Sequence, residues 1–196
     1  MTKNRMEAFS DGVFAIIITI MVLEMKPPHG ATFADLAPLF PVFLSYVLSF
    51  IYVGIYWNNH HHMLHSVKGV DGKVLWANNF LLFWLSLFPF ATAWMGENHF
   101  ETLPVALYGV PLLLAGASYS LLCRALIRHN GASSTLAQVL SRDMKARVSM
   151  FGYIAAIPLA YVHPGISLAI YVGAAVLWLV PDRRLEKALS ESPAHH

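Results

Sequence analysis

Apolar residues fall into six long segments that are separated by short polar turns. The turns KPPHG, VDGK, GENHFE, NGASS and HPG carry the glycine, proline and asparagine residues that interrupt regular structure. A helix needs about 20 apolar residues to cross a bilayer, and backbone groups in lipid must be satisfied within the segment. Segments of this length therefore predict membrane helices and not an alternating barrel. The predicted spans are 5–26, 39–62, 75–96, 104–127, 148–163 and 165–181.

Composition agrees with this pattern. Hydrophobic residues make up 57% of the 196 residues and charged residues only 12%, where a soluble domain has roughly a quarter charged residues. We therefore predict an all-α integral membrane protein with a single six-helix domain over 1–185 and a cytoplasmic tail over 186–196. The last two spans are short and joined by His163-Pro164-Gly165, which predicts a helical hairpin. The first apolar run lacks a small-residue cleavage site and is expected to be a retained helix.

The basic residues predict the orientation of the helices. Twelve of the thirteen lie on one side of the predicted membrane and only Lys26 on the other, so the positive-inside rule places both termini in the cytoplasm of a multi-pass plasma-membrane protein. The net charge of +2 gives no reason to expect a nucleic-acid partner. The twelve basic residues on the predicted cytoplasmic side are Lys3, Arg5, Lys68, Lys73, Arg124, Arg128, Arg142, Lys145, Arg147, Arg183, Arg184 and Lys187.

One face of the first span is apolar and branched. On a helical wheel, Ile20 and Leu23 fall within about 40° of Ile16, and Thr19 falls within about 60°. Such a stripe is typical of ordinary helix packing as well as of a pore wall. The Thr19 hydroxyl, likewise, can bond a carbonyl one turn back or contact an ion.

A polar pair lies on a different face of the same span. Arg5 and Phe9 continue the apolar stripe toward the cytoplasm, whereas Ser10 and Asp11 point well away from it. An ionisable residue at membrane depth usually faces the interior of a helix bundle. We therefore expect Ser10 and Asp11 to find partners inside the protein.

The opening residues resemble a known signature. Arg5, Phe9, Ser10 and Asp11 match the R-x-x-x-F-S-D pattern of the transmembrane-protein-175 family of potassium channels, and the VLE that ends the span also fits. IYWNNHHHMLH in the second span and LWANNFLLFWLSLFPFATAW in the third are similar too. The length and the six spans resemble the prokaryotic branch, which has one such repeat per chain.

This resemblance implies a homotetramer whose first helices line a central pore through the lipid bilayer. It implies a potassium-permeable pore for monovalent cations that lacks a carbonyl filter, and the chain has no TVGYG-like stretch. Rings of Ile16, Ile20 and Leu23 would form the constriction, and Thr19 would add a ring of hydroxyl groups. Glu24 would lie at the outer mouth, and the permeant K⁺ would be the only bound group, since no cofactor is implied.

Several polar and aromatic residues of the first three spans lie at about the depth of Ser10 and Asp11. A charge-assisted network among them would anchor the pore helix to its neighbours. Arg5 is a further candidate to pair with Asp11 of its own or an adjacent subunit. The predicted anchoring network comprises Arg5, Phe9, Ser10, Asp11, Trp57, Asn58, His60, His61, Asn78 and Asn79.

The histidine run raises the question of a metal site. A helix would place His61 and His65 on one face, as zinc requires, but no H-E-x-x-H pattern and no nearby cysteine accompanies them. We therefore predict no metal site and give His60 or His61 a structural hydrogen-bonding role. Whether the run from His60 to His62 senses pH or binds a metal stays open.

Two other functions are weighed against a channel. A secondary transporter usually has internal repeats and polar groups near the midplane, whereas this chain has no repeat and the first span has only Thr19 at mid-depth. An intramembrane metalloenzyme built on the histidines lacks a nucleophile–base pair. We therefore expect a potassium channel and not an enzyme.

Overall fold

The computed structural model describes residues 2–131, 137 and 144–179, and the regular structure in these residues is entirely helical, which confirms the all-α prediction. The predicted tail 186–196 and the basic residues 142, 183, 184 and 187 lie outside the described residues. The elements are α1 (Lys3–Leu23), α2 (Phe33–Leu36), the 3₁₀ turn η1 (Ala37–Leu39), α3 (Phe40–His65), α4 (Gly72–Ser86), α5 (Phe88–Glu97), α6 (Thr102–Asn130), α8 (Met144–Leu159) and α9 (Pro164–Leu179).

Four stretches of the described chain are long and apolar enough to cross a membrane. They are Lys3–Leu23, Phe33–His65, Gly72–Glu97 and Thr102–Asn130. At 1.5 Å per residue, α1 is about 31 Å long, close to the roughly 30 Å hydrocarbon core. The helices α8 and α9 have 16 residues each and reach only about 24 Å. The membrane crossing of this hairpin therefore stays a prediction.

The α8–α9 hairpin turns where HPG stands in the sequence. Helix α8 ends at Leu159, before the predicted end at residue 163, and a tight turn follows it. The α conformation is sterically disfavoured for the residue that precedes a proline, so α8 is not expected to continue through His163 into Pro164. Pro164 instead opens α9, and the Gly165 N–H donates to His163 Nδ1 at 3.0 Å.

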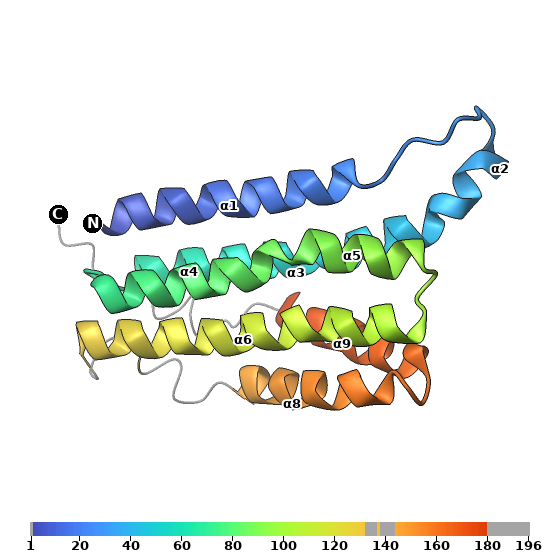
Figure 1. Cartoon of the computed structure of the whole chain (residues 1–196). Coiled ribbons are helices and arrows are strands. Elements are labelled where there is room, and N and C mark those ends of the chain that lie inside the picture. Colours follow the sequence, from blue (N-terminus) through green and yellow to red (C-terminus); the bar gives the residue numbers. More distant parts are fainter. Residues whose placement is uncertain (1, 132–136, 138–143, 180–196) are drawn as a thin grey trace.

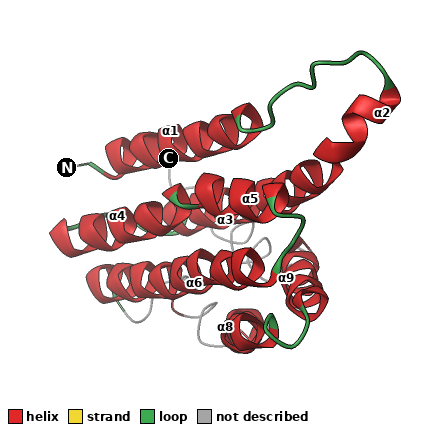
Figure 2. Cartoon of the chain, turned by 45° about the vertical axis from the view of Figure 1, so that its right-hand side comes forward, coloured by secondary structure: helices red, strands yellow, loops and turns green. Residues whose placement is uncertain are grey.

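The helices form a bundle in which α1 lies along one side. Helix α1 packs on α3, α4 and α5, while α6 packs on α4 and α8. The α8–α9 hairpin covers the side of the bundle away from α1 (Figure 1). The turned view shows the same order, with the chain between α1 and α2 reaching beyond the end of the bundle (Figure 2). Within the described residues, helix α1 therefore keeps one face that no other helix covers.

The bundle behind α1 is tied together by buried hydroxyl groups. Ser49 Oγ of α3 lies 2.6 Å from Thr92 Oγ1 of α5 and 2.9 Å from the Tyr108 hydroxyl of α6. All three side chains are buried. Hydrogen bonds between helices are a common stabilising contact in membrane proteins, where the hydrophobic effect does not press helices together. They give α1 a fixed surface to pack against.

The third predicted span, 75–96, is broken in the structure. Helix α4 ends at Ser86 and α5 begins at Phe88, with Leu87 between them. Pro89 has no backbone N–H, so it cannot donate to the carbonyl four residues earlier, and its ring disfavours a straight helix there. The break changes the direction of the chain where it passes beside α1.

The loop between α3 and α4 is held at both ends. Asn130, the last residue of α6, accepts hydrogen bonds from the backbone N–H groups of Lys68 and Gly69 at 3.1 and 3.2 Å. Asp71 caps α4 by accepting the Val74 N–H at 2.9 Å, and this bond lowers the pKa of the Asp71 carboxyl from its usual value. The ends of α3, α4 and α6 are thus joined beside the start of α1.

Candidate pore helix and its anchoring network

Helix α1 has one buried face and one exposed face. Its buried residues, spaced three or four apart, are Met6, Ser10, Phe14, Ile17 and Met21. The stripe of Ile16, Thr19, Ile20 and Leu23 lies on the other face: Ile16 is 58% exposed, Ile20 41% and Leu23 75%. The described part of a single chain therefore leaves the three large apolar side chains of this stripe exposed.

Thr19 bonds to its own helix. Its hydroxyl donates to the Ala15 carbonyl at 2.6 Å and approaches the Ile16 carbonyl at 3.1 Å. This is the back-bonding that the sequence left open as an alternative to ion contact. Because the donor is used within the helix and Thr19 is exposed, its hydroxyl oxygen keeps its lone pairs as acceptors at the helix surface.

Ser10 lies in a buried chain of hydrogen bonds across three helices. Its Oγ donates to the Met6 carbonyl at 2.9 Å and accepts from Asn78 Nδ2 of α4 at 3.0 Å. Asn78 Oδ1 is 2.8 Å from His60 Nε2 of α3. Ser10, Asn78 and His60 are at most 1% exposed.

This chain of bonds assigns the protons. The amide oxygen of Asn78 can only accept, so His60 carries its proton on Nε2. His60 Nδ1 is buried without a hydrogen-bond partner among the described residues. The rings of His60 and Phe14 meet edge to face, with their centroids 5.7 Å apart. The three polar side chains thus fix the register of α1 against α3 and α4, since a shift of α1 would leave Asn78 or Ser10 unpaired.

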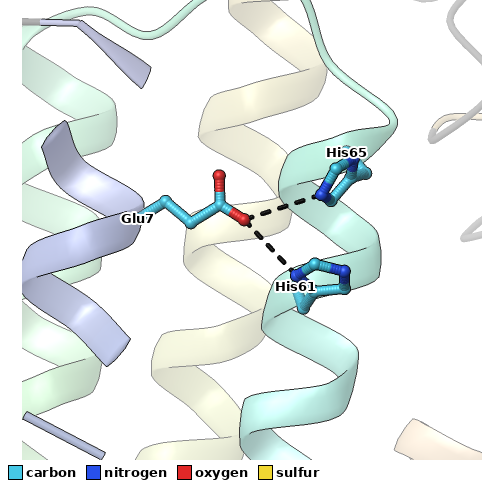
Figure 3. A group of neighbouring side chains, drawn as sticks. All are labelled: Glu7, His61 and His65. Carbon is cyan, nitrogen blue, oxygen red and sulfur yellow. Dashed lines mark ion pairs between the residues drawn. The ribbon is translucent and has the colours of Figure 1, made fainter. Parts of the chain in front are cut away.

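Glu7 meets two histidines of α3. Its Oε1 lies 3.3 Å from His61 Nδ1 and 3.7 Å from His65 Nε2 (Figure 3). The Glu7 side chain is 19% exposed, and those of His61 and His65 are 40% and 57% exposed. Sequence reasoning named His61 but did not name Glu7 or place His65 in the network.

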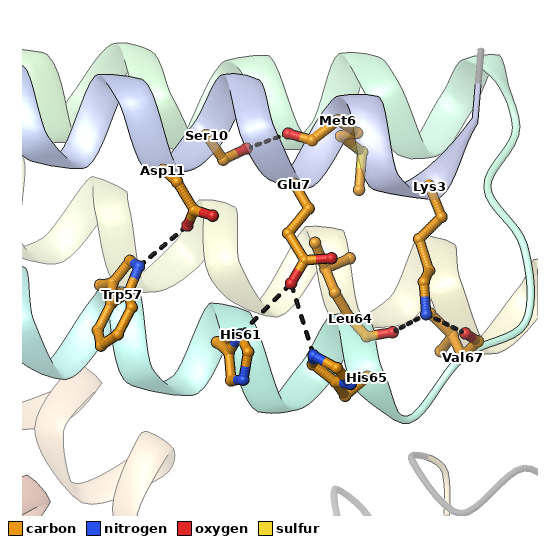
Figure 4. A network of polar contacts seen from close by, with 10 residues as sticks. All are labelled: Lys3, Met6, Glu7, Ser10, Asp11, Trp57, His61, Leu64, His65 and Val67. Carbon is orange, nitrogen blue, oxygen red and sulfur yellow. Dashed lines mark hydrogen bonds and ion pairs between the residues drawn. The ribbon is translucent and has the colours of Figure 1, made fainter.

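Lys3 and Asp11 extend the contact between α1 and α3 on either side of Glu7 (Figure 4). Lys3 Nζ donates to the carbonyls of Leu64 and Val67, both at 3.2 Å, at the end of α3. Trp57 Nε1 donates to Asp11 Oδ1 at 2.9 Å. We call the contact of Lys3, Glu7, Ser10 and Asp11 with α3 and α4 the anchoring seam.

Four residues of the predicted network do not enter the anchoring seam within one chain. Arg5 and Phe9 lie on the exposed face of α1, with Phe9 55% exposed, and Asn58 and Asn79 are exposed on α3 and α4. Their helical phase turns them away from the contact between α1 and the bundle. Among the described residues Arg5 forms no ion pair with Asp11 of its own chain, and its pairing with an adjacent subunit stays a prediction.

Glu24 follows α1 directly and is exposed. It lines a surface hollow together with Ile20 of α1 and Phe90, Trp94 and Glu97 of α5. Two carboxylates therefore flank the end of α1 that is opposite the anchoring seam. Such a pair gives this end a negative potential.

The apolar spans and the anchoring seam define the class of protein: a multi-pass α-helical membrane protein with one helix fastened along the side of its bundle. Residues 5–89 match the family model described as endosomal/lysosomal potassium channel TMEM175. These residues include α1 from Arg5 onward and all of α3 and α4, and so all of the anchoring seam except Lys3.

One relative matches nearly the full length of the chain. A potassium channel of Chryseobacterium sp. (strain P1-3) is 50% identical over 192 residues, which are 98% of this chain and 100% of the relative. A potassium channel of Streptomyces collinus is 38% identical over 99 residues, or 48% of each chain. The crystal structure of a lysosomal potassium-selective channel TMEM175 homolog from Chamaesiphon minutus has a TM-score of 0.77 and 27% identity, covering 93% of this chain and 97% of that one. The chain belongs to the TMEM175 family.

Proposed function

We propose that this protein conducts potassium passively through a central pore that is lined by α1 from four copies of the chain. The protein is a potassium channel of the TMEM175 family and not an enzyme. The finer proposal concerns the path of the ion: rings of Ile16, Ile20 and Leu23 form the constriction, and Thr19 supplies a ring of hydroxyl oxygens. Permeant cations and further copies of the chain are its partners, and the bilayer surrounds it.

The observation that carries this proposal is the division of α1 into two faces. Its buried face is fixed by the anchoring seam, so the orientation of the exposed stripe is fixed as well. Ile16 and Leu23 are more than half exposed, and Ile20, at the edge of the hollow beside α5, is 41% exposed. They belong to a helix that lies along one side of the bundle (Figure 1). Four such helices around an axis would enclose these side chains.

An apolar neck of this kind has a clear physical behaviour. Water and ions leave a sufficiently narrow apolar tube, so the channel is closed by dewetting and opens when the helices tilt or rotate apart. Potassium is less strongly hydrated than sodium, and the hydroxyl lone pairs of Thr19 can replace part of its hydration shell. No backbone-carbonyl filter is needed for a preference of this kind.

The distribution of charge supports an orientation with the N-terminus in the cytoplasm. Helices α1 and α4 begin, and α3 and α6 end, on the same side of the bundle (Figure 1). Lys3, Arg5, Lys68, Lys73 and Arg128 belong to these ends. Basic residues beside membrane spans favour the cytoplasmic side. The acidic end with Glu24 and Glu97 is then the outer mouth, where it would concentrate cations.

Ile16→Asn tests the constriction. An amide ring should wet the neck, and each 1.4 kcal/mol removed from the permeation barrier raises conductance about tenfold. We expect single-channel conductance in a planar bilayer with potassium and sodium gradients to rise about tenfold. Ile154→Asn on α8 is the matched control, because Ile154 is 51% exposed but remote from α1, and its conductance should equal that of the parent.

Unchanged conductance in Ile16→Asn, with Ile154→Asn also unchanged, would place the neck elsewhere. Chemical cross-linking of the reconstituted protein gives the number of subunits, and any number other than four would contradict the tetramer. Coupled, saturating flux without single-channel current would instead indicate a secondary transporter.

A further inference from the structure

Glu7, His61 and His65 form a cluster that conduction through the proposed neck does not use. They come from two helices that are distant in sequence, with Glu7 on α1 and the two histidines one turn apart on α3 (Figure 3). One ligand atom from each, taken together, lies within 4.8 Å of the others. Lys3 and Asp11 on the same face of α1 are engaged elsewhere, with backbone carbonyls and with Trp57.

The separations within the cluster match those around a tetrahedral metal ion. Zinc binds imidazole nitrogen at about 2.0–2.1 Å and carboxylate oxygen at about 2.0–2.2 Å, which places neighbouring ligand atoms roughly 3.3–3.5 Å apart. Glu7 Oε1 lies 3.3 Å from His61 Nδ1 and 3.7 Å from His65 Nε2. The His61 and His65 ligand atoms lie within 4.8 Å of each other.

The electrostatics also favour a divalent cation. The rings of His61 and His65 have centroids 4.3 Å apart, so two protonated rings would repel each other beside a single carboxylate. A metal ion takes both rings in their neutral form and satisfies the Glu7 carboxylate at the same time. His65 is 57% exposed, which leaves an entry path from water and room for a water molecule in the fourth position.

We propose that Glu7, His61 and His65 bind a divalent transition-metal ion of the zinc class and thereby clamp α1 to α3. The site has three protein ligands, two histidines and one glutamate, a set that zinc accepts. The sequence pattern did not reveal it because the carboxylate comes from a different helix, so no H-E-x-x-H spacing exists. The channel family favours a restraint over catalysis.

The clamp has a consequence that rests on the proposed function. If α1 lines the pore, a metal ion bound by Glu7, His61 and His65 stiffens the N-terminal end about which α1 would tilt, and so opposes the tilt that opens the neck. Metal added on the cytoplasmic side should then lower the potassium current. Metal binding itself does not depend on the pore.

Metal binding is tested by two titrations of the purified full chain. Zn²⁺ binding is measured by calorimetry, and Co²⁺ binding is measured by the visible absorption of the bound ion. Glu7→Gln and His65→Gln should each weaken the strongest site by about 10- to 100-fold or more, since losing even a residue that only supports a ligand costs this much. His62→Gln is the matched control: His62 is adjacent in the same run but is not part of the cluster. It should bind as tightly as the parent.

Equal Zn²⁺ affinity in the parent and in all three variants would overturn the proposed site and assign metal binding to other histidines. A loss of affinity in Glu7→Gln and His65→Gln, but not in His62→Gln, supports the site. The current is measured separately, and Zn²⁺ should reduce it in the parent and in His62→Gln but not in Glu7→Gln. A parent current that is insensitive to saturating Zn²⁺ would refute the clamp. A chain that binds metal at this site but passes no potassium would contradict the proposed function and leave the metal site standing.

Discussion

The two halves of α1 are held to the bundle in different ways. The N-terminal half carries the anchoring seam, in which Lys3, Glu7, Ser10 and Asp11 make polar contacts with α3 and α4. The C-terminal half is held by the buried apolar side chains of Ile17 and Met21. Among the described residues, the polar side chain of another helix that bonds to it is Thr92 of α5, whose Oγ1 lies 3.8 Å from Met21 Sδ.

This difference separates fixed position from freedom to move. Polar contacts are directional and fix both rotation and register, whereas apolar packing between helices in lipid is not driven by the hydrophobic effect and tolerates small tilts. The exposed stripe from Ile16 to Leu23 lies on the C-terminal half. A helix fastened at one end can thus open or close a neck at the other without exposing an unpaired buried polar group.

Asn78→Leu breaks the polar half most severely. It leaves the Nε2–H of His60 without an acceptor and Ser10 without its donor. Each buried unpaired group costs about 1–3 kcal/mol, so we expect a loss of about 2–6 kcal/mol in the free energy of unfolding. The midpoint of thermal unfolding in detergent measures it. Asn79→Leu, which alters the exposed neighbour, should change stability by at most about 0.5 kcal/mol. Equal losses in both variants would show that the buried bonds do not anchor α1.

Met21→Ala tests the apolar half. Met21 is 2% exposed. Its truncation should lower the free energy of unfolding by about 2 kcal/mol, the lower end of the range for a buried methionine. The cost is at this lower end because in lipid the variant loses packing contacts but no hydrophobic transfer energy. Val22→Ala, at a position that is 40% exposed, is the control and should cost clearly less in the same unfolding assay. A loss larger than that of Asn78→Leu would reverse the contrast between the halves.

The bond between Asp11 and Trp57 should have the smallest effect, because both residues are partly exposed. A double-mutant cycle of Asp11→Ala and Trp57→Phe isolates it, and we expect a coupling energy of about 0.5–1.5 kcal/mol. The same unfolding assay gives all four values. Additive losses would remove this bond from the anchoring seam and leave Ser10 and Asn78 as its centre.

Much of the anchoring seam could be predicted from the sequence. The helical wheel separated Ser10 and Asp11 from the apolar stripe, and matching depths along the spans named Trp57, His60 and Asn78, with which the structure shows them in contact. Depth alone does not give helical phase, however. It therefore also admitted Asn58 and Asn79, which lie at the same depth but face outward.

Other features needed the structure. Lys3, Glu7 and Asp11 recur every four residues, and this spacing was a signal that they share a face, but the carbonyl partners of Lys3 and the approach of His65 to Glu7 depend on how α1 crosses α3. Arg5 and Phe9 were placed in the network because they belong to the motif, although the wheel had put them on the exposed stripe.

The side of α1 that faces the ion is tested most directly by chemical modification during recording. With Cys123 replaced by alanine, Ile20→Cys and Ile166→Cys are compared before and after a water-soluble, positively charged thiol reagent is added. Both isoleucines are 41% exposed in the single chain, but only Ile20 lies on the proposed pore stripe. We predict that the reagent blocks the potassium current of Ile20→Cys and leaves that of Ile166→Cys unchanged. An unaffected current in Ile20→Cys, whose modification is verified by mass spectrometry, would show that this face of α1 does not line the pore.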